Sequence, residues 1–376
     1  MSAMPPPHDA APVAAATAIT WSDPQREASF QAWLARTAPS HGLLPGSLRL
    51  ASADASFRRY FRIDAAGANA QGAASRIIMD APPAQENSEP FVRIASLMAA
   101  AGLTVPTVLD WDREQGFLLL SDLGTQTMMD VIDRDNAEAN VTRYRQAIDA
   151  LIALQTASRP DVLPAYDQTL LQRELSLFPD WYITRHRGIT LTDAMRTTLD
   201  GAFTQIVANN LSAPSVYVHR DFMPRNLMAR PDSRLGVLDF QDAVYGPITY
   251  DIASLMRDAF LSWEEDFVID ITVRYWQEAR KAGLLGENSA SGWGDDFGEF
   301  YRAVEWMGLQ RHLKVAGIFA RLTLRDGKPR YLADTPRFIG YIRATAGRYR
   351  ELKPLLRLVD EIEGTQAVTG FAYGRV

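Results

Sequence analysis

The chain contains 376 residues, of which 47% are apolar and 22% are charged, and its formal net charge is −6. This length exceeds the usual size of a single hydrophobic core, so we expect one large bilobal domain or two packed domains. The negative charge argues against a general nucleic-acid surface, and the absence of cysteine excludes disulfides and thiolate chemistry. No stretch is long and apolar enough to span a bilayer, so the sequence predicts neither nucleic acid nor membrane as a partner.

The first segment of the chain, residues 1–20, is rich in proline and alanine. A secretory signal peptide would have a basic start and a leucine-rich core, and this segment has neither. We interpret residues 1–20 as a disordered leader on a cytoplasmic protein.

Residues 21–122 are predicted to form a small, β-rich N-terminal lobe that binds a nucleotide. Ser22 or Asp23 can cap a first helix, whose apolar stripe includes Phe30 and Trp33. Strands are expected in "GSLRLASADASFRRYFRID", in "SRIIMD" and twice in "VPTVLDWDREQGFLLLSDLG". A helix is expected in "PFVRIASLMAAAG", where Gly102 provides the stop. Up to about residue 122 the chain should therefore form a small sheet that carries one helix.

Residues 123–376 are predicted to form a larger, mainly helical C-terminal lobe. Helical spacing of apolar residues runs through "VTRYRQAIDALIALQ", "LTDAMRTTLDGAFTQIVANN", "PITYDIASLMRDAFLSW" and "EFYRAVEWMGLQRHLKVAGIFARL". These helices surround only two or three short strands, in "VYVHRDFMPRNLM" and "LGVLDFQDAVYGP". The predicted fold class is α+β, with two lobes of unequal size.

Polar side chains gather where these short strands end. His219, Asp221 and Asn226 share a tight loop, and Asp239 follows an apolar run. Burying lone carboxylates is costly, and a metal ion with a phosphorylated ligand would compensate them. Phosphoryl transfer from ATP needs Mg²⁺ against the phosphates and an oriented nucleophile. Asp221 could orient the acceptor hydroxyl, while Asn226 and Asp239 offer oxygen ligands to Mg²⁺.

The motifs "VHRDFMPRNLM", "GVLDFQDAVYGPITYDIASL" and "GFLLLSDLG" resemble the aminoglycoside phosphotransferase/choline kinase family, a branch of the protein-kinase-like superfamily. "ASFRRYFRI", "MDAPP", "ELSLFPDWY" and "RHLKVAGIFARLTLRDGKPRYL" also resemble the bacterial anomeric sugar kinases of cell-wall recycling, which phosphorylate N-acetylmuramate and N-acetylglucosamine at C1. The resemblance spans most of residues 45–345. It implies a bilobal protein-kinase-like fold, ATP and Mg²⁺ as cofactors, and an amino sugar as substrate.

The resemblance also implies roles for individual residues. Asp221 matches the catalytic base, Asn226 and Asp239 match the metal ligands, and Asp251 matches a position that braces the catalytic loop. The predicted phosphate-covering loop consists of Ser52, Ala53, Asp54, Ala55 and Ser56. The main chain of two further residues is predicted to meet the adenine, and these are Ser121 and Leu123.

The third strand departs from the kinase pattern. Kinases place a lysine there for the α- and β-phosphates, paired with a glutamate near the next helix. In this chain Met79 or its neighbour occupies that place, and no lysine precedes Lys281, although Glu86 and Glu89 remain near the helix. The contact is either lost or supplied by an arginine. The candidates are Arg59, Arg62 and Arg76.

The sugar site is predicted from chemistry and from the resemblance. An arginine fork suits the lactyl carboxylate of N-acetylmuramate, and an aromatic ring suits the face of a pyranose. The candidates are Glu174, Trp181, Tyr182, Arg311 and His312. The two aromatic residues can equally be packing residues. The last two lie in a long helix, where solvated charge is the default expectation.

The function implied by the resemblance is ATP- and Mg²⁺-dependent phosphorylation of the anomeric (C1) hydroxyl of N-acetylmuramate and N-acetylglucosamine in peptidoglycan recycling. A nucleotidyltransferase would then receive the product. One alternative is a kinase for an aminoglycoside or choline, although the arginine-rich helical lobe suits an anionic substrate better. Another is a non-catalytic nucleotide-binding scaffold, which the missing lysine suggests and the intact Asp221, Asn226 and Asp239 oppose.

Overall fold

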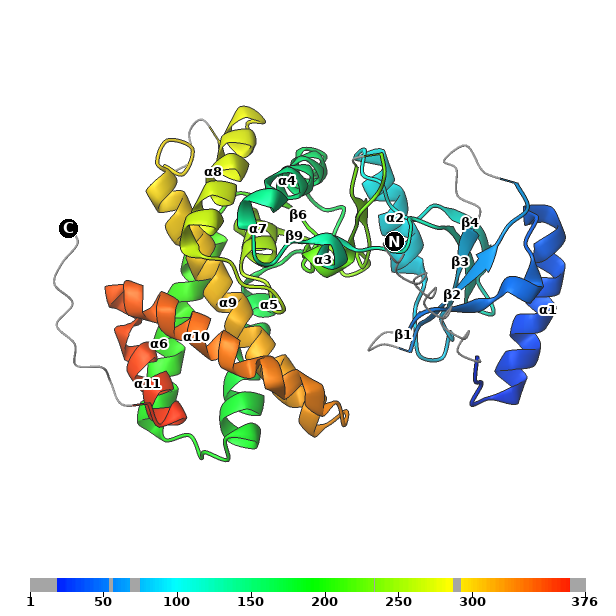
Figure 1. Cartoon of the computed structure of the whole chain (residues 1–376). Coiled ribbons are helices and arrows are strands. Elements are labelled where there is room, and N and C mark those ends of the chain that lie inside the picture. The colour runs from blue at the N-terminus through cyan, green and yellow to red at the C-terminus, as the bar shows by residue number, and fades with distance from the viewer. Residues whose placement is uncertain (1–18, 54–56, 68–74, 233, 287–291, 366–376) are drawn as a thin grey trace, which may run out of the picture. The chain divides into compact units, whose positions relative to one another are not determined.

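The computed structural model describes residues 19–53, 57–67, 75–232, 234–286 and 292–365. The chain forms two compact units. The first comprises Met1–Ser96 and Pro106–Gly124, and the second comprises Leu97–Val105 and Thr125–Val376. The first contains a β-sheet and the second is mainly helical, which confirms the predicted α+β fold class (Figure 1).

The first unit is built on a five-stranded sheet with the order β1-β2-β3-β5-β4, in which all neighbours are antiparallel. Its strands are β1 (Arg49–Ala53), β2 (Arg59–Asp64), β3 (Ser75–Asp80), β4 (Val108–Asp112) and β5 (Phe117–Ser121). Each lies in a segment for which the sequence predicts a strand. Helix α2 (Glu89–Ala100) connects β3 to β4 and continues into the second unit.

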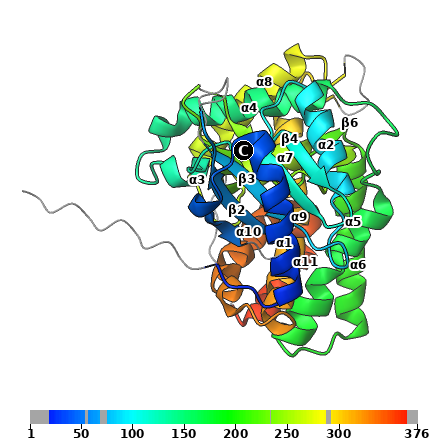
Figure 2. The same cartoon turned by 90° about the vertical axis from the view of Figure 1, so that its right-hand side faces the viewer.

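Helix α1 (Pro24–His41) covers one face of this sheet (Figure 2). The Asp23 side chain caps it by accepting from the Gln25 main-chain N–H at 2.9 Å, and Gly42 ends it with a φ of 61°. The helix buries its apolar stripe against alternate residues of the strands. This core contains Phe30, Trp33, Leu34, Ala38, Leu43, Phe61, Ile63, Ala65, Ile78, Phe117 and Leu119. Burial stabilises the fold by roughly 1.5–3 kcal/mol for each large side chain.

The second unit surrounds two short strand pairs with helices. Strand β6 (Ser215–Val218) pairs with β9 (Val244–Pro247), and β7 (Leu227–Met228) pairs with β8 (Gly236–Val237). Its α-helices are α3 (Met128–Val131), α4 (Val141–Thr156), α5 (Gln168–Leu175), α6 (Asp193–Leu211), α7 (Thr249–Met256), α8 (Glu265–Lys281), α9 (Phe297–Leu324), α10 (Thr335–Arg348) and α11 (Lys353–Glu363). A π-helix, η3 (Phe178–His186), follows α5. The short 3₁₀-helices of the two units are η1 (Pro45–Ser47), η2 (Ala137–Asn140), η4 (Pro224–Asn226), η5 (Pro329–Asp334) and η6 (Arg350–Leu352).

Helix α9 is the central element of the second unit. It packs against η3, α5, α6, α7, α8 and α10, and most of the residues in its middle are buried. Neighbours on several sides explain why polar residues such as Gln310 and Arg311 lie buried within it. Gly317 lets α9 pack closely against the main chain of Leu177, because a side chain at position 317 would meet that main chain.

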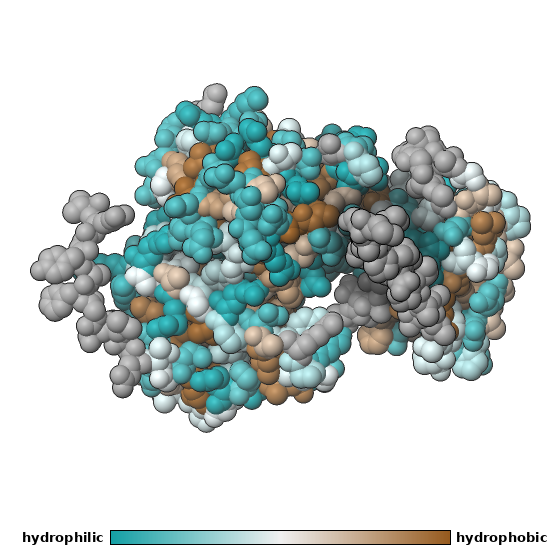
Figure 3. Space-filling model, viewed as in Figure 1, coloured by the Kyte–Doolittle hydropathy of each residue, from teal (hydrophilic) through white to brown (hydrophobic). Residues whose placement is uncertain are grey.

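Figure 3 shows hydrophilic side chains over most of the visible face, with apolar ones scattered among them. The exposed large apolar side chains in the described ranges are Leu44, Leu50, Phe57, Leu109, Val162, Leu211 and Leu324. In the part of the chain that the structure describes, no helix combines the length and apolarity that a membrane crossing requires.

Candidate active site

The two short strand pairs of the second unit bring the predicted catalytic residues together. The loop from His219 to Asn226 runs from β6 to β7, and Asp239 follows β8. Because β7 and β8 pair in a hairpin, Asn226 and Asp239 become neighbours, and the Asn226 Nδ2 donates to Asp239 Oδ2 at 3.3 Å. The same Nδ2 donates to the Asp221 carbonyl at 2.9 Å. Three residues separated by up to 18 positions therefore meet in one cluster.

His219 is a structural part of this loop. It is fully buried, its Nε2 lies 2.9 Å from the Leu238 carbonyl, and its Nδ1 accepts from the Asp221 main-chain N–H at 3.3 Å. Burial lowers the pKa of His219, against the opposing effect of Asp251 and Asp221. The ring is therefore neutral, with its proton on Nε2, and it fixes the main chain at Asp221.

Asp251, at the start of α7, braces the loop as predicted. Its Oδ2 accepts from the His219 main-chain N–H at 2.7 Å, and its Oδ1 accepts from the Arg220 main-chain N–H at 3.0 Å. The side chain is fully buried, and burial raises the pKa of Asp251 against the opposing effect of these two main-chain donors. The buried brace fixes the two residues that precede Asp221.

Arg220 adopts a left-handed conformation, with a φ of 77°. This costs a non-glycine residue about 1–2 kcal/mol, so the surrounding contacts must hold it. Its carbonyl accepts from Arg311 Nη1 at 2.9 Å, and its guanidinium pairs with Glu174. Contacts therefore fix both the main chain and the side chain of Arg220. This also fixes the position of the next residue, Asp221.

Glu174, on α5, is the anionic centre of a buried charged cluster. It binds the Arg220 guanidinium at 2.5 Å and Lys314 Nζ at 2.9 Å, and it accepts a short hydrogen bond from the Tyr166 hydroxyl. Burial alone would raise the pKa of Glu174, but Lys314 and Arg220 lower it, so the carboxylate is ionised. These partners give Glu174 a positioning role through Arg220, and its contact with a sugar stays a prediction.

Asn226 and Asp239 offer oxygen atoms that could bind Mg²⁺. Asn226 uses its amide nitrogen for the two bonds described above, which leaves the amide oxygen as a hard ligand. Asp239 has a φ of 63°, and its Oδ1 accepts from Gln241. No group of three or more acidic or histidine side chains forms a metal site within the described ranges. Two oxygen ligands suit Mg²⁺, which usually takes its other ligands from phosphates and water.

The expectation that Arg311 and His312 are solvated was wrong. Their exposed fractions are 5% and 3%. Arg311 binds the Arg220 carbonyl, and although burial alone would lower its pKa, Tyr250 and Asp221 raise it, so it remains charged. His312 stacks on Tyr341, and burial lowers its pKa to about 3, so it is neutral. The central place of α9 explains both outcomes.

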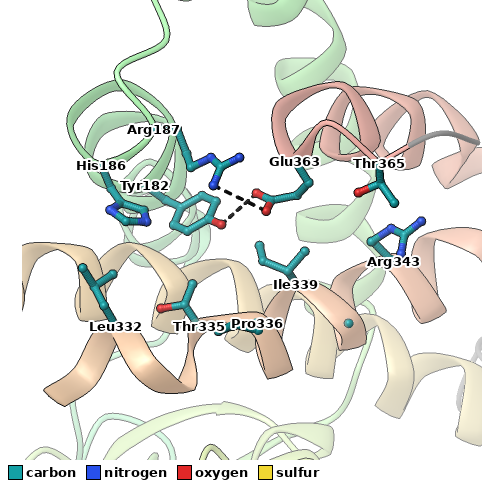
Figure 4. A pocket seen from close by; sticks show the side chains of 11 residues that line it. Tyr182, His186, Arg187, Leu332, Thr335, Pro336, Ile339, Arg343, Glu363 and Thr365 are labelled. Atoms are coloured by element: carbon teal, nitrogen blue, oxygen red, sulfur yellow. Dashed lines mark hydrogen bonds and ion pairs between the residues drawn. The ribbon is translucent and has the colours of Figure 1, made fainter.

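Trp181 and Tyr182 lie on the π-helix η3. Tyr182 is buried and lines a pocket of about 320 Å³ with residues of α10 and α11 (Figure 4). Its hydroxyl donates to Glu363 at 2.8 Å, and the Trp181 ring contacts the Arg185 guanidinium. Among the contacts of the described residues, neither aromatic ring touches the catalytic loop. Their sugar-binding role stays a prediction.

The predicted nucleotide-binding residues belong to the first unit. Ser52 and Ala53 lie in β1 opposite Tyr60 and Arg59, whereas Asp54, Ala55 and Ser56 lie outside the described residues. The Ser121 main-chain N–H bonds to the Thr107 carbonyl at 2.9 Å, and Ser121 Oγ accepts from the Thr107 N–H. Within the described ranges no main-chain hydrogen bond involves Leu123. The adenine-binding role of Ser121 and Leu123 stays a prediction.

The arginines proposed to replace the missing lysine have other partners. Arg59 and Arg26 both bind the fully buried Asp80, and Arg62 binds Asp122 through two bonds of 2.6 and 3.1 Å. Arg76 donates to the Ser75 carbonyl. Sequence reasoning missed a further arginine, Arg58, whose guanidinium lies 3.1 Å from the Glu86 carboxylate. The only signal was its place in the run "FRRYFR", which does not identify a partner.

The chain is similar in sequence to a known protein family and to several curated proteins. The model of the phosphotransferase enzyme family matches residues 47–285. The chain is 50% identical over 318 residues to the N-acetylmuramate/N-acetylglucosamine kinase of Pseudomonas putida, covering 85% of this chain and 89% of that protein. It is 44% identical over 351 residues to the protein of the same name from Neisseria meningitidis serogroup B, covering 93% and 100% of the two chains.

Solved structures share the fold at low sequence identity. An ethanolamine kinase from Plasmodium vivax aligns with a TM-score of 0.56 and 10% identity over 86% of this chain and 89% of that one. The ADP-bound aminoglycoside phosphotransferase APH(2'')-Ib aligns with a TM-score of 0.52 and 15% identity over 82% and 96% of the two chains. At these identities the likeness shows the protein-kinase-like fold alone.

Proposed function

The chain belongs to the phosphotransferase enzyme family, and from this premise we propose that it uses ATP to phosphorylate the anomeric (C1) hydroxyl of N-acetylmuramate and N-acetylglucosamine. The single observation that carries the substrate is the 50% identity, across 89% of its length, to a kinase named for these two sugars. The ATP-dependent class of reaction follows from the family.

Asp221 is the proposed catalytic residue. Its carboxylate would accept a hydrogen bond from the C1 hydroxyl and orient that oxygen for in-line attack on the γ-phosphorus, with ADP as the leaving group. His219 and Asp251 support this role because they hold the main chain on either side of Arg220. Such preorganisation matters because small misplacements of a reacting group reduce the rate strongly.

Asn226 and Asp239 are the proposed holders of Mg²⁺. The hydrogen bonds of the Asn226 amide nitrogen to Asp239 and to the Asp221 carbonyl leave the amide oxygen available as a ligand. When bound, the ion would neutralise charge on the transferring phosphoryl group. The role of these residues is to fix its place beside Asp221.

The proposed setting is the cytoplasm, where ATP is available. A sugar 1-phosphate is the usual acceptor of a nucleotidyl group, so a nucleotidyltransferase is the proposed consumer of the product in peptidoglycan recycling. The proposed division places the nucleotide site in residues 21–122 and the catalytic, metal and sugar sites in residues 123–376, with residues 1–20 as a leader.

The test is ATP consumption with Mg²⁺ across N-acetylmuramate, N-acetylglucosamine, glucosamine, choline and kanamycin, with phosphorus NMR of any product. We expect a sugar 1-phosphate signal with the first two substrates only. Turnover of choline or kanamycin instead would replace the substrate assignment. No turnover of any substrate, with normal ATP binding, would favour a non-catalytic scaffold.

A substitution at Asp221 distinguishes a role in catalysis from a role in folding. Asp221→Asn keeps the side-chain volume and should lower kcat by about 10²–10⁴-fold while ATP binding persists. Asp200→Asn is the matched control, because Asp200 is an exposed carboxylate on α6 of the same unit. Equal losses in nucleotide affinity and rate for Asp221→Asn would point to a structural role.

A further inference from the structure

The missing third-strand lysine leaves the ATP phosphates without their usual cation, and we propose that Arg58, held by Glu86, supplies that cation. This inference rests on the proposed use of ATP as phosphoryl donor. Kinases pair the phosphate-binding lysine with a glutamate near the following helix, which holds the cation in place. In this chain the Arg58 guanidinium lies 3.1 Å from the carboxylate of Glu86, three residues before α2.

The alternation of side chains across the sheet puts Arg58 on the appropriate face. Phe61 and Ile63 of β2 belong to the core beneath α1, so Tyr60 and Arg62 face the other side. Tyr60 is the direct partner of Met79 on β3. Arg58 directly precedes β2, and the same alternation, continued by one residue beyond the strand, would place it on the face that Met79 occupies. In this proposal the phosphate-binding cation comes from the residue before β2 instead of from β3.

The other arginines of the sheet are less suited to binding the ATP phosphates. Arg59 alternates onto the α1 face, where it stacks on Trp21 and binds the buried Asp80. Arg76 occupies the same face as Ile78, by the same alternation. Arg62 shares the face of Met79, but it binds Asp122 through two bonds and also donates to the Gly124 carbonyl at 2.6 Å.

The Arg58–Glu86 pair has the features of a prepared site. The exposed side-chain fractions are 11% and 15%, so the pair is shielded from bulk water but not sealed. Glu86 also accepts from the Phe57 main-chain N–H at 3.2 Å. The carboxylate therefore fixes both the guanidinium and the main chain directly before it.

The chemistry of arginine permits this double role. A guanidinium carries five N–H donors in a rigid fork, so it can pair with a carboxylate and still present donors to phosphate oxygens. A lysine at the start of β2 would act as a point charge with less geometric control. Arg58 should therefore contribute affinity for the phosphates and none for the adenosine part of ATP.

The experiment compares nucleotides that differ only in their phosphates. Affinities for AMP-PNP with Mg²⁺ and for adenosine are measured by calorimetry on the full chain, without sugar, for the wild type, Arg58→Met and Arg58→Lys. We expect Arg58→Met to weaken AMP-PNP binding by at least 10-fold and to leave adenosine binding unchanged. Arg58→Lys should recover part of the loss. Unchanged AMP-PNP affinity, or equal loss for both ligands, would overturn the proposal.

Two further variants keep the result interpretable. Glu86→Gln keeps the shape of the side chain, removes the charge that holds Arg58, and should weaken AMP-PNP binding by about threefold or more. It replaces Arg58→Met as the deciding variant if that protein does not fold. Arg49→Met is the control, because Arg49 forms an exposed pair with Asp64 in the same sheet. A comparable loss of AMP-PNP affinity in this control would also overturn the proposal.

The outcome is independent of the substrate assignment. Nucleotide binding without sugar tests Arg58 even if no sugar is turned over, in which case only the proposed function fails. If the wild type phosphorylates N-acetylmuramate and Arg58→Met does so with an unchanged KM for ATP, only the present inference fails.

Discussion

The Arg311 guanidinium donates to the main-chain carbonyl of Arg220 at 2.9 Å, so the central helix α9 directly holds the residue that precedes Asp221. Asp251 binds the main-chain N–H of the same residue from α7. Both main-chain groups of Arg220 are thus held by buried polar side chains of two different helices. This arrangement gives a physical reason why a left-handed arginine can persist next to the proposed catalytic residue.

Arg311→Met is expected to lower kcat by about 100-fold with little change in the KM for ATP. The Arg220 carbonyl would lose its donor, and displacement of Asp221 by about 1 Å has a cost of that order. Steady-state kinetics with the sugar substrate checks the result, with circular dichroism to confirm folding.

Two other variants sharpen that measurement. Arg311→Lys keeps the charge and one donor and should recover part of kcat. Arg302→Met removes an arginine from the same helix that pairs with Glu351, and its kinetic constants should match those of the wild type. If Arg311→Met retained the wild-type kcat, the main-chain contact would have no part in catalysis.

Glu174→Gln is expected to destabilise the protein by about 3–5 kcal/mol, because Arg220 and Lys314 would be left as uncompensated, largely buried cations. Adding Lys314→Met to Glu174→Gln should recover part of this loss. Urea unfolding of the two single variants and the double variant gives the coupling free energy. Glu278→Gln, in the exposed pair with Lys281, should change stability by less than about 1 kcal/mol. Additive effects of Glu174→Gln and Lys314→Met would contradict the proposed charge cluster.

Local patterns in the sequence were sufficient to predict most of the fold. Alternating residues such as Phe61 and Ile63 marked β2, and the expected cap at Ser22 or Asp23 marked the start of α1, where Asp23 is the cap. The cluster of Asp221, Asn226 and Asp239 could also be foreseen, because a hairpin between the last two brings them together. These features depend on spacing within short segments, which a sequence displays directly.

Contacts between distant segments could not be predicted in this way. Arg58 and Glu86 are 28 residues apart, and Glu174 is separated from Lys314 by 140 residues, so no spacing rule connects them. The burial of Arg311 was missed for a different reason. Helix α9 has neighbours on several sides. A polar residue in its sequence therefore does not indicate a side of the helix that faces solvent.

Gly317→Ala is expected to destabilise the protein by about 3 kcal/mol. A Cβ atom there would lie 2.3 Å from the Leu177 carbonyl oxygen, so α9 would have to move away from the chain that leads into η3. Gly340→Ala in α10 is the matched control, because its Cβ would meet nothing within 4 Å, and it should stabilise the helix by about 0.5–1 kcal/mol. Thermal and urea unfolding measure both effects. Equal stabilities for the two variants would mean that α9 and Leu177 are not in close contact.

Asp258 is expected to make stability depend on pH. Burial raises its pKa to about 6, from an ordinary value of 3.8, although Arg311 and Arg225 oppose the effect. Its Oδ1 accepts from the Phe260 N–H, whereas its buried Oδ2 has no hydrogen-bond partner among the described residues. A raised carboxyl pKa means that the folded state favours the neutral form. The folded state is therefore penalised once the carboxyl ionises.

The sign of the effect follows from the two pKa values. Below about pH 4 the carboxyl is protonated in both states and costs nothing, and between about pH 4 and pH 6 the penalty grows to about 3 kcal/mol. Asp258→Asn cannot ionise, so it should be more stable than the wild type at pH 8 and lose most of that advantage near pH 4.5. Urea unfolding at both pH values measures the difference. Asp270→Asn, in an exposed pair with Arg274, should show no comparable advantage at pH 8, and the same gain there would contradict the assignment to Asp258.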